Sequence, residues 1–481
     1  MNTARRTLPT LVGLLALLIS GLLLAAPASA IKPAENFEVG FADSLYNDPD
    51  KSDKELKLTE TTNADFIRVN MYWSQVAYNK PTNPRDPGDP AYNWMGYDTA
   101  IRNATARDFQ VDLTVLAAPS WAEGPNRPTD TDKYPLGSWR PDADAFGDFA
   151  AALAKRYSGT YVPAGSTEPL PQVKFFEAWN EPNLSTYITP QWEGKENVAS
   201  DIYQRLLNNF YDEIKAVDPD SKVVTGGTAP YGDPPGGPNR TQPLRFMQEM
   251  LCLTPSNKKT DCPNGEPSKF DIWAHHPINR LDPPETKADN KGDIQVADFG
   301  TLTKTMRKAE KLGTPGTPGT HELWANEVWW QTNPPDKDEG FPLKTHARFL
   351  AQALYMLWDE GASNVSFLQF RDAKYKPGEF TLASYQTGVY TYNGKRKPSA
   401  DAVKFPFVTD RKGRKLFAWG RAPEGGKLTI EAKTKGGGFK KVASLNVDED
   451  GIFTDTLNIK GKAKLRAKVG GETSLVWNQK D

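Results

Sequence analysis

Strand-like and helix-like segments alternate eight times along most of this 481-residue chain, and this repetition limits the possible folds more than any other feature. Short apolar runs are the strand candidates: residues 37–41, 65–70, 110–117, 173–179, 222–227, 270–276, 323–327 and 364–370. Amphipathic segments lie between them, and in residues 199–217 apolar side chains recur at helical spacing. Residues 144–157 and 344–361 are also expected to be helices. The pattern predicts an α/β fold, a (β/α)8 TIM barrel of parallel strands, over residues 31–405.

Two other classes of protein are disfavoured. An open doubly wound sheet is the competing architecture, but no Gly-x-Gly-x-x-Gly follows the first strand candidate, which argues against a dinucleotide-binding fold. The chain carries 59 basic and 60 acidic side chains, so its overall charge gives no reason to expect nucleic acid as a partner. We expect neither a cofactor nor a metal, and we expect a monomer.

The pattern changes after residue 405. Residues 427–433, 441–447 and 464–470 alternate apolar and polar side chains with a period of two, and glycine-rich or acidic turns separate them. Residues 406–481 carry 16 basic and 9 acidic side chains, whereas residues 31–405 carry 41 and 51. We therefore predict a separate, small antiparallel β-sandwich of immunoglobulin-like size over residues 406–481. No trio of exposed aromatic residues is evident there, which favours packing or spacing over carbohydrate binding as its role.

The first thirty residues read as a secretory signal peptide. Arg5 and Arg6 precede an apolar run over residues 11–26, and Ala28-Ser29-Ala30 has the form of a cleavage site. Cleavage after Ala30 would give a secreted, extracellular protein. An uncleaved membrane anchor is the alternative, but the run is short for the ~20 residues that a span needs. No later segment is apolar enough, so we expect no membrane span in the mature chain.

Cysteine usage fits export. The chain has two cysteines, Cys252 and Cys262, and in an oxidising compartment such a close pair is expected to form one disulfide. A zinc site is the alternative, but two cysteines alone cannot fill a tetrahedral shell.

Two carboxylates end strand candidates on the side of the barrel where active sites lie. Glu181 follows the fourth strand and Glu327 the seventh, whereas Glu322 lies where the seventh strand begins. Strict alternation would put Glu177, Trp179 and Glu181 on one face, with Glu177 deeper in the barrel and paired. It would likewise put Leu323, Ala325 and Glu327 on one face. Two carboxylates that face one cavity are the apparatus of glycoside hydrolysis.

Further polar and aromatic side chains lie near strand ends. Arg68 could keep a nucleophile charged or make an ordinary buried ion pair. Of His275 and His276, only one is expected to face inward, where it could orient Glu327 or bind a sugar hydroxyl. Gln369 ends the eighth strand and could bind a hydroxyl group. The aromatic candidates for sugar platforms, each with a packing role as the alternative, are Trp73, Trp121, Tyr231 and Trp330.

The segments FFEAWNEPN, FDIWAHHP and LWANEVWW, with two glutamates 146 positions apart, resemble the retaining glycoside hydrolases of clan A, and most of all glycoside hydrolase family 39. The resemblance covers about residues 36–405. It implies that Glu181 is the general acid/base, that Glu327 is the nucleophile and that Asn180 binds the sugar 2-hydroxyl. His275 matches a histidine of that family. Trp329 stands where glycine is common, a departure that changes the shape of the pocket.

The sequence thus predicts a secreted retaining glycoside hydrolase that acts on a plant or microbial polysaccharide or oligosaccharide. Two alternatives stay open. One is a non-catalytic polysaccharide-binding protein on the same barrel, and the other is a transglycosylase that uses the same site. The identity of the sugar and the choice between endo and exo action stay open as well.

Overall fold

The computed structural model describes residues 31–234, 237, 239–434 and 437–479. Eight parallel strands close into a barrel in the order β1-β12-β9-β8-β7-β4-β3-β2. Their bounds are β1 Glu38–Ala42, β2 Phe66–Tyr72, β3 Gln110–Leu116, β4 Phe175–Ala178, β7 Lys222–Thr225, β8 Ile272–His275, β9 Glu322–Val328 and β12 Ala362–Leu368. Each overlaps one of the eight predicted runs, which confirms the predicted TIM barrel. The predicted signal peptide lies outside the described residues.

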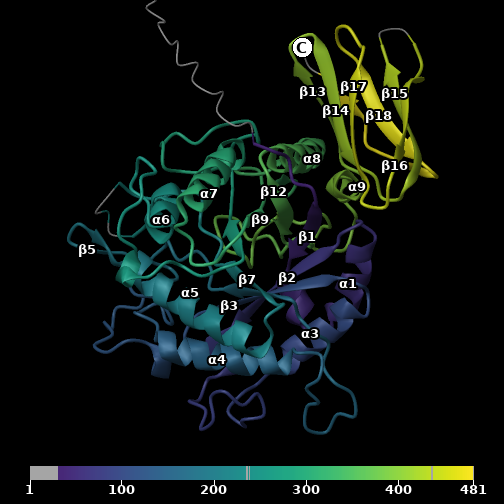
Figure 1. The fold of residues 1–481 in the computed structure, drawn as a ribbon. Helices are drawn as coiled ribbons and strands as arrows, with labels where there is room; N and C mark the ends of the chain where they lie inside the picture. Colours follow the sequence, from purple (N-terminus) through teal and green to yellow (C-terminus); the bar gives the residue numbers. More distant parts are fainter. Residues whose placement is uncertain (1–30, 235–236, 238, 435–436, 480–481) are drawn as a thin grey trace, which may run out of the picture. The chain divides into compact units, whose positions relative to one another are not determined.

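Helices surround the barrel strands (Figure 1). The principal ones are α1 Ser52–Glu60, α3 Met95–Thr105, α4 Ala143–Arg156, α5 Val198–Val217, α6 Pro243–Met250, α7 Gly300–Leu312 and α8 Leu343–Asp359. The three helices expected from the sequence match α4, α5 and α8 within a residue or two. In α5 the predicted apolar stripe is buried, because a helix of a barrel gains most of its stability from packing that stripe against the strands.

Aromatic rings fill the floor of the barrel. Phe66 of β2 and Phe175 of β4 each lie with their ring centroids 5.1 Å from that of Trp324 of β9. They belong to a small apolar cluster inside the barrel, separate from the large core between strands and helices. This packing closes the N-terminal end of the barrel and leaves the polar side chains above it at the opposite end.

Antiparallel strands follow the barrel, as predicted. One sheet has the order β13-β14-β17 and the other β16-β15-β18-β19, with β20 also paired to β18. Their bounds are β13 Phe407–Lys412, β14 Lys415–Arg421, β15 Gly426–Lys433, β16 Lys440–Val447, β17 Ile452–Leu457, β18 Lys464–Val469, β19 Glu472–Thr473 and β20 Trp477–Asn478. Residues 31–481 cluster as one compact unit, so the boundary of a separate domain at residue 405 stays a prediction.

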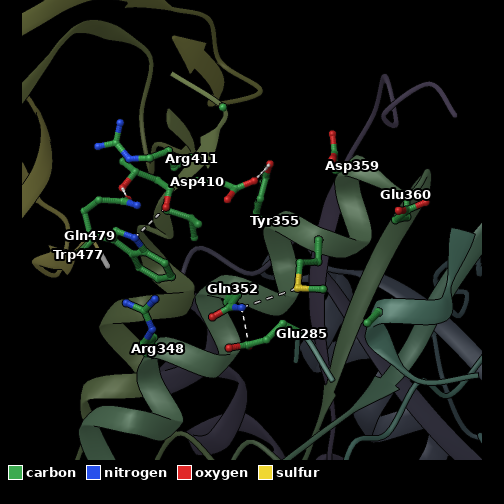
Figure 2. A pocket seen from close by; sticks show the side chains of 15 residues that line it. Glu285, Arg348, Gln352, Tyr355, Asp359, Glu360, Asp410, Arg411, Trp477 and Gln479 are labelled. Atoms are coloured by element: carbon green, nitrogen blue, oxygen red, sulfur yellow. Dashed lines mark hydrogen bonds between the residues drawn. The ribbon is translucent and has the colours of Figure 1, made fainter. Parts of the chain in front are cut away.

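The C-terminal strands pack on α8. The ring of Trp419 lies 5.8 Å from that of Tyr355 and 5.7 Å from that of Trp358. The guanidinium of Arg348 lies 3.8 Å from the centroid of Trp477, beside a cavity of about 560 Å³ (Figure 2). The described residues that line this cavity include four carboxylates, Glu285, Asp359, Glu360 and Asp410, but no histidine.

Cys252 and Cys262 form a disulfide, as predicted. In the part of the chain that the structure describes, none of the helices combines the length and the apolar character that a membrane span requires.

Candidate active site

Glu181 reaches the barrel cavity because the chain leaves strand geometry directly after β4. Trp179 and Glu181 both have left-handed backbone conformations, with φ of 77° and 39°, which side chains other than glycine rarely adopt. The Trp179 ring therefore turns outward, packs 5.5 Å from that of Phe146, and donates a hydrogen bond from Nε1 to the Tyr187 carbonyl. The predicted shared face of Glu177, Trp179 and Glu181 is wrong, although Glu177 is buried and paired as expected.

Glu327 reaches the same cavity through an irregularity in β9. Ala325 pairs with Val365 of β12, whereas Val328 pairs with Phe367, so β9 holds one more residue than β12 over this stretch. Below this bulge, Trp324 belongs to the cluster inside the barrel, and Leu323 belongs to the outer core. Strict alternation would turn Glu327 outward with Leu323, and the bulge re-aims it. The predicted inward face of β9 is therefore wrong, while Glu327 still lines the cavity.

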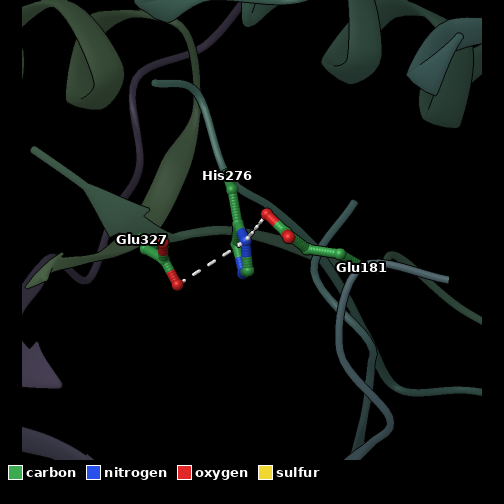
Figure 3. Close-up of side chains that lie close together, drawn as sticks. All are labelled: Glu181, His276 and Glu327. Carbon is green, nitrogen blue, oxygen red and sulfur yellow. Dashed lines mark hydrogen bonds and ion pairs between the residues drawn. The ribbon is translucent and has the colours of Figure 1, made fainter. Parts of the chain in front are cut away.

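His276 links the two carboxylates (Figure 3). Its Nδ1 lies 2.9 Å from Oε1 of Glu181 and 3.8 Å from Oε2 of Glu327. One ligand atom from each of the three residues lies within 4.8 Å of the others, so an oxygen of Glu181 and an oxygen of Glu327 are no further apart than this. The two glutamate side chains are 13% and 15% exposed, which leaves each of them open to the cavity.

Burial sets the charge states of these three groups. Burial raises the pKa of Glu181 to about 7, against the opposing charge of Arg68. Burial also raises the pKa of Glu327, as does the negative charge of Glu181, while His276 and then Arg68 act against this rise. Burial lowers the pKa of His276 to about 4, so the imidazole is neutral at neutral pH. A pair of carboxyl groups this close holds one proton more readily than two negative charges.

A buried ionic network supports the site from below. Glu177 accepts hydrogen bonds from Arg68 Nε at 2.7 Å, from Thr114 at 2.7 Å, from Asn326 at 3.0 Å and from the Gly227 amide at 2.9 Å. Burial alone would raise the pKa of Glu177, but the charge and hydrogen bonds of Arg68 outweigh it and lower that pKa to about 2. Glu177 is therefore a permanent anion that fixes Arg68.

Arg68 carries this network up to the candidate catalytic groups. Its Nη2 donates a hydrogen bond of 2.9 Å to Oδ1 of Asn180, and its Nη1 lies 3.6 Å from Oε2 of Glu327. The arginine thus orients the Asn180 amide and places a positive charge beside Glu327.

Gly227 is the position where a side chain would disturb His276 most directly. A Cβ there would lie 2.2 Å from Nε2 of His276 and 2.8 Å from Oδ1 of Asn326. Both partners are buried, so neither can move without a rearrangement. For the hydrolysis proposed below, we expect Gly227→Ala to lower kcat/KM by about 100-fold, because a shift of ~1 Å next to the two carboxylates has an effect of this size.

The matched control for this substitution is Gly471→Ala, where an added Cβ meets nothing within 4 Å. We expect the control to be as active and as stable as the native protein. Steady-state kinetics and thermal melts of both variants check this prediction, and an unimpaired Gly227→Ala protein would contradict it.

The cavity around the two glutamates has a volume of about 390 Å³. Polar side chains line it, among them Asn70, Tyr72, Asn180, Asn279 and Gln295. Large apolar side chains that are about half exposed line it as well: Tyr231, Leu281, Phe380 and Leu382. A lining that combines polar groups with exposed apolar surface suits a sugar ring, whose hydroxyl groups need partners and whose C–H faces pack on apolar surface.

The structure brings six of the eleven predicted catalytic and substrate-binding residues to this cavity or directly beneath it. They are Glu181, Glu327, Asn180, Arg68, His276 and Tyr231. The other five do not line the cavity, namely His275, Trp73, Trp121, Trp330 and Gln369.

Local packing explains where those five side chains lie. Both ring nitrogens of His275 are used, by Thr228 and by the Ile294 carbonyl. Trp73 stacks on Phe149 at 5.7 Å with Trp121 at its edge. Trp330 donates to the Asp282 carbonyl and Gln369 to the Leu382 carbonyl.

Several cavity residues were not predicted as site residues. Asn70 and Tyr72 follow Arg68 by two and four positions on β2, so strand alternation was a usable signal for them. Tyr187 and Tyr385 come from loops, and no periodicity announces them. Trp329 lines the cavity and packs its ring 5.2 Å from that of Tyr385, so the residue that departs from the family pattern does shape the pocket.

Carboxylate and imidazole groups are also metal ligands, and Glu181, His276 and Glu327 are the one group of this kind that is close enough among the described residues. The hydrogen bond between His276 and Glu181 already occupies the imidazole Nδ1. The arrangement as it stands brings together two carboxyl groups, one of which can hold a proton at neutral pH, and an imidazole that contacts both.

No protein-family model and no curated protein matches the chain. Among solved structures, a family 39 glycoside hydrolase from the gut symbiont Bacteroides cellulosilyticus WH2 superposes with a TM-score of 0.56 at 14% identity, covering 87% of this chain and 80% of that one. A glucosidase from Croceicoccus marinus gives 0.51 at 12% identity, over 89% and 95%. A monomeric β-xylosidase from Caulobacter crescentus CB15 gives 0.50 at 17% identity, over 90% and 98%. The chain therefore shares its fold with glycoside hydrolases of the family 39 type, as the sequence predicts.

Proposed function

We propose that this protein is a retaining glycoside hydrolase that uses Glu181 as general acid/base and Glu327 as nucleophile. The observation that carries the proposal is the meeting of two carboxylates from distant parts of the chain, with oxygens within 4.8 Å of one another across one cavity. Retaining enzymes hold their carboxyl groups about 5–5.5 Å apart, whereas inverting enzymes leave about 6.5–9.5 Å for a water molecule. The spacing here supports the retaining geometry.

The reaction would proceed in two displacements. Protonated Glu181 donates its proton to the glycosidic oxygen while ionised Glu327 attacks the anomeric carbon, which breaks the glycosidic bond and forms a glycosyl ester. Glu181, now ionised, then takes a proton from water, which attacks the same carbon and releases Glu327. The charge of Arg68 beside Glu327 favours the carboxylate, and Asn180, which lines the cavity, would bind a sugar hydroxyl.

The proposal is tested with aryl glycosides and with the stereochemistry of the product. Xylosides and glucosides come first, because similar structures include a β-xylosidase and a glucosidase, followed by galactosides, arabinosides and polysaccharides. Proton NMR should show the first product with the anomeric configuration of the substrate, and EDTA should leave the rate unchanged. An inverted product, or saccharide binding without bond cleavage, would refute the mechanism, and a glycosylated acceptor in place of free sugar would identify a transglycosylase.

The pH dependence should follow from the two carboxyl groups. Glu181 must carry a proton to act as an acid, so kcat/KM should fall as the pH rises through about 7. Glu327 must be ionised, and its pKa is raised, so activity should fall on the acid side at a pH above the ordinary glutamate value of 4.5. A profile of kcat/KM from pH 4 to 9 checks both limbs. A rate that stays flat through pH 7 would contradict the role of Glu181.

We also propose that the protein is exported, with cleavage after Ala30, and that it acts as a monomer. The disulfide between Cys252 and Cys262 is compatible with an oxidising compartment, and one of the similar structures is described as monomeric. Mass spectrometry of the mature protein should find Ile31 as its first residue. A cell-retained chain that keeps residues 1–30 would contradict export.

A further inference from the structure

The second C-terminal sheet presents a strongly basic surface. Along β15, Leu428, Ile430 and Ala432 are buried while the residues between them face solvent, and β18 alternates in the same way. Cross-strand pairing with β16 and β18 then defines which outward side chains lie together. This basic face consists of Lys427, Lys433, Lys441, Lys464, Arg466 and Lys468.

One acidic side chain lies among these six cations. Glu431 pairs across the strands with Arg466 and with Lys441, and its carboxylate forms an ion pair of 2.7 Å with Arg466. Within the described ranges, none of the five lysines has an ion-pair partner. The basic face therefore carries a net charge of +5 at neutral pH.

Like charges are placed directly opposite one another on this surface. Lys433 of β15 pairs with Lys464 of β18 in the antiparallel register. Such a pair destabilises a sheet when nothing neutralises it. Residues 31–405, in contrast, carry ten more acidic than basic side chains, so the positive charge is concentrated on one part of the protein.

The face is built for ionic binding and not for stacking. Neutral sugars stack on exposed aromatic rings. The aromatic ring that contacts this face is that of Phe439, which is half buried, and the guanidinium of Arg466 lies 4.1 Å from its centroid. Side chains two residues apart on a strand lie about 6.6–6.8 Å apart, and neighbouring strands are about 4.8 Å apart. These spacings form a two-dimensional array of cations, which suits an extended chain that carries many negative charges.

We propose that the basic face binds acidic polysaccharide, through the carboxylates of uronic acid residues, and holds the barrel close to a saccharide substrate. The choice of a polysaccharide over other polyanions rests on the proposed function of the barrel. The binding itself depends only on the basic face, so the two proposals can fail separately.

The test measures binding of the full-length protein to polygalacturonate, with dextran as a neutral polymer and double-stranded DNA as a different polyanion. The variant Lys433→Gln/Lys464→Gln/Lys468→Gln removes three positive charges from the basic face. The matched control is Lys304→Gln/Lys308→Gln/Lys311→Gln, which removes three exposed lysines from α7. Thermal melts verify that both variants fold.

We expect the native protein to bind polygalacturonate but not dextran, and to lose affinity with increasing salt. The β15/β18 variant should bind about tenfold more weakly or worse, whereas the α7 control should bind like the native protein. Glu327→Gln should also bind like the native protein although it is inactive, which separates this proposal from the proposed hydrolysis. Equal binding by the β15/β18 variant, or tighter binding to DNA than to polygalacturonate, would overturn the proposal.

Discussion

Glu327→Gln should reduce turnover of an aryl glycoside more than any other single substitution in the barrel. The amide keeps the size of the side chain and its position in the bulge of β9, but it cannot form the glycosyl ester. We expect kcat to fall by more than the roughly 10²–10⁴-fold that general acid–base catalysis contributes. Steady-state kinetics on the best substrate of the panel measures the effect.

Two comparisons make this result specific. Glu322→Gln changes a carboxylate at the other end of the same strand, where its partner is Ser363, and it should leave kcat within about twofold. Glu181→Gln should slow substrates with poor leaving groups by about 10²–10⁴-fold but spare the first step for a dinitrophenyl glycoside, which needs no proton to depart. If Glu322→Gln lowered kcat as much as Glu327→Gln does, the loss of activity in Glu327→Gln would come from a disturbed structure and not from a missing nucleophile.

Among the substitutions named for the barrel, Arg68→Met should cause the largest decrease in the free energy of unfolding. The substitution leaves the carboxylate of Glu177 buried without its cation, and breaking such a pair costs about 3–5 kcal/mol in the free energy of unfolding. Burial and bidentate contact make this pair unlike those on the surface, since both side chains are 0% exposed. Urea denaturation of the purified variant measures the loss.

The control for this prediction is Arg85→Met, which breaks a half-exposed arrangement with Asp148 and Glu213. Exposed pairs contribute about 0–1 kcal/mol, so this variant should unfold almost like the native protein. Adding Glu177→Gln to Arg68→Met should recover part of the stability, because it removes the uncompensated charge. No recovery in the double variant would mean that Arg68 acts through its packing and not through Glu177.

The barrel could be predicted because its signal is repeated. Each of the eight strands buries side chains on both faces, which gives a short and mainly apolar run, and helices such as α5 show a stripe with helical spacing. The positions of Glu181 and Glu327 were also predictable, since each follows such a run at its carboxyl end. For the barrel elements and for these two glutamates alike, the pattern that supports the prediction lies within a few neighbouring residues of the sequence.

The orientation of side chains at the site could not be predicted by the same means. Strict alternation placed Trp179 beside Glu181, but a left-handed backbone at Trp179 turns its ring into the outer core. The bulge in β9 depends on pairing with β12, which the sequence of β9 alone does not encode. His276 lies one residue past β8, so its inward direction depends on the chain after the strand.

The roles of aromatic residues near strand ends could not be predicted from the sequence either. Trp73 and Trp330 are in the right part of the sequence for a sugar platform, yet both are fully buried. A tryptophan near a strand end can stabilise the barrel by packing between strand and helix, or it can bind substrate. The neighbouring residues in the sequence do not distinguish these two roles. The loop residues Tyr187 and Tyr385, which do line the cavity, come from segments with no regular pattern.

Covalent trapping tests the central claim most directly. A 2-deoxy-2-fluoro glycoside of the preferred sugar, with a dinitrophenyl leaving group, should inactivate the native protein and add the mass of one fluorosugar to it. Peptide mapping should find that mass as an ester on the side chain of Glu327, and Glu327→Gln should remain unlabelled. Stable label on another residue, or steady turnover of the sugar with no trapped ester, would contradict the assignment of Glu327 as the nucleophile.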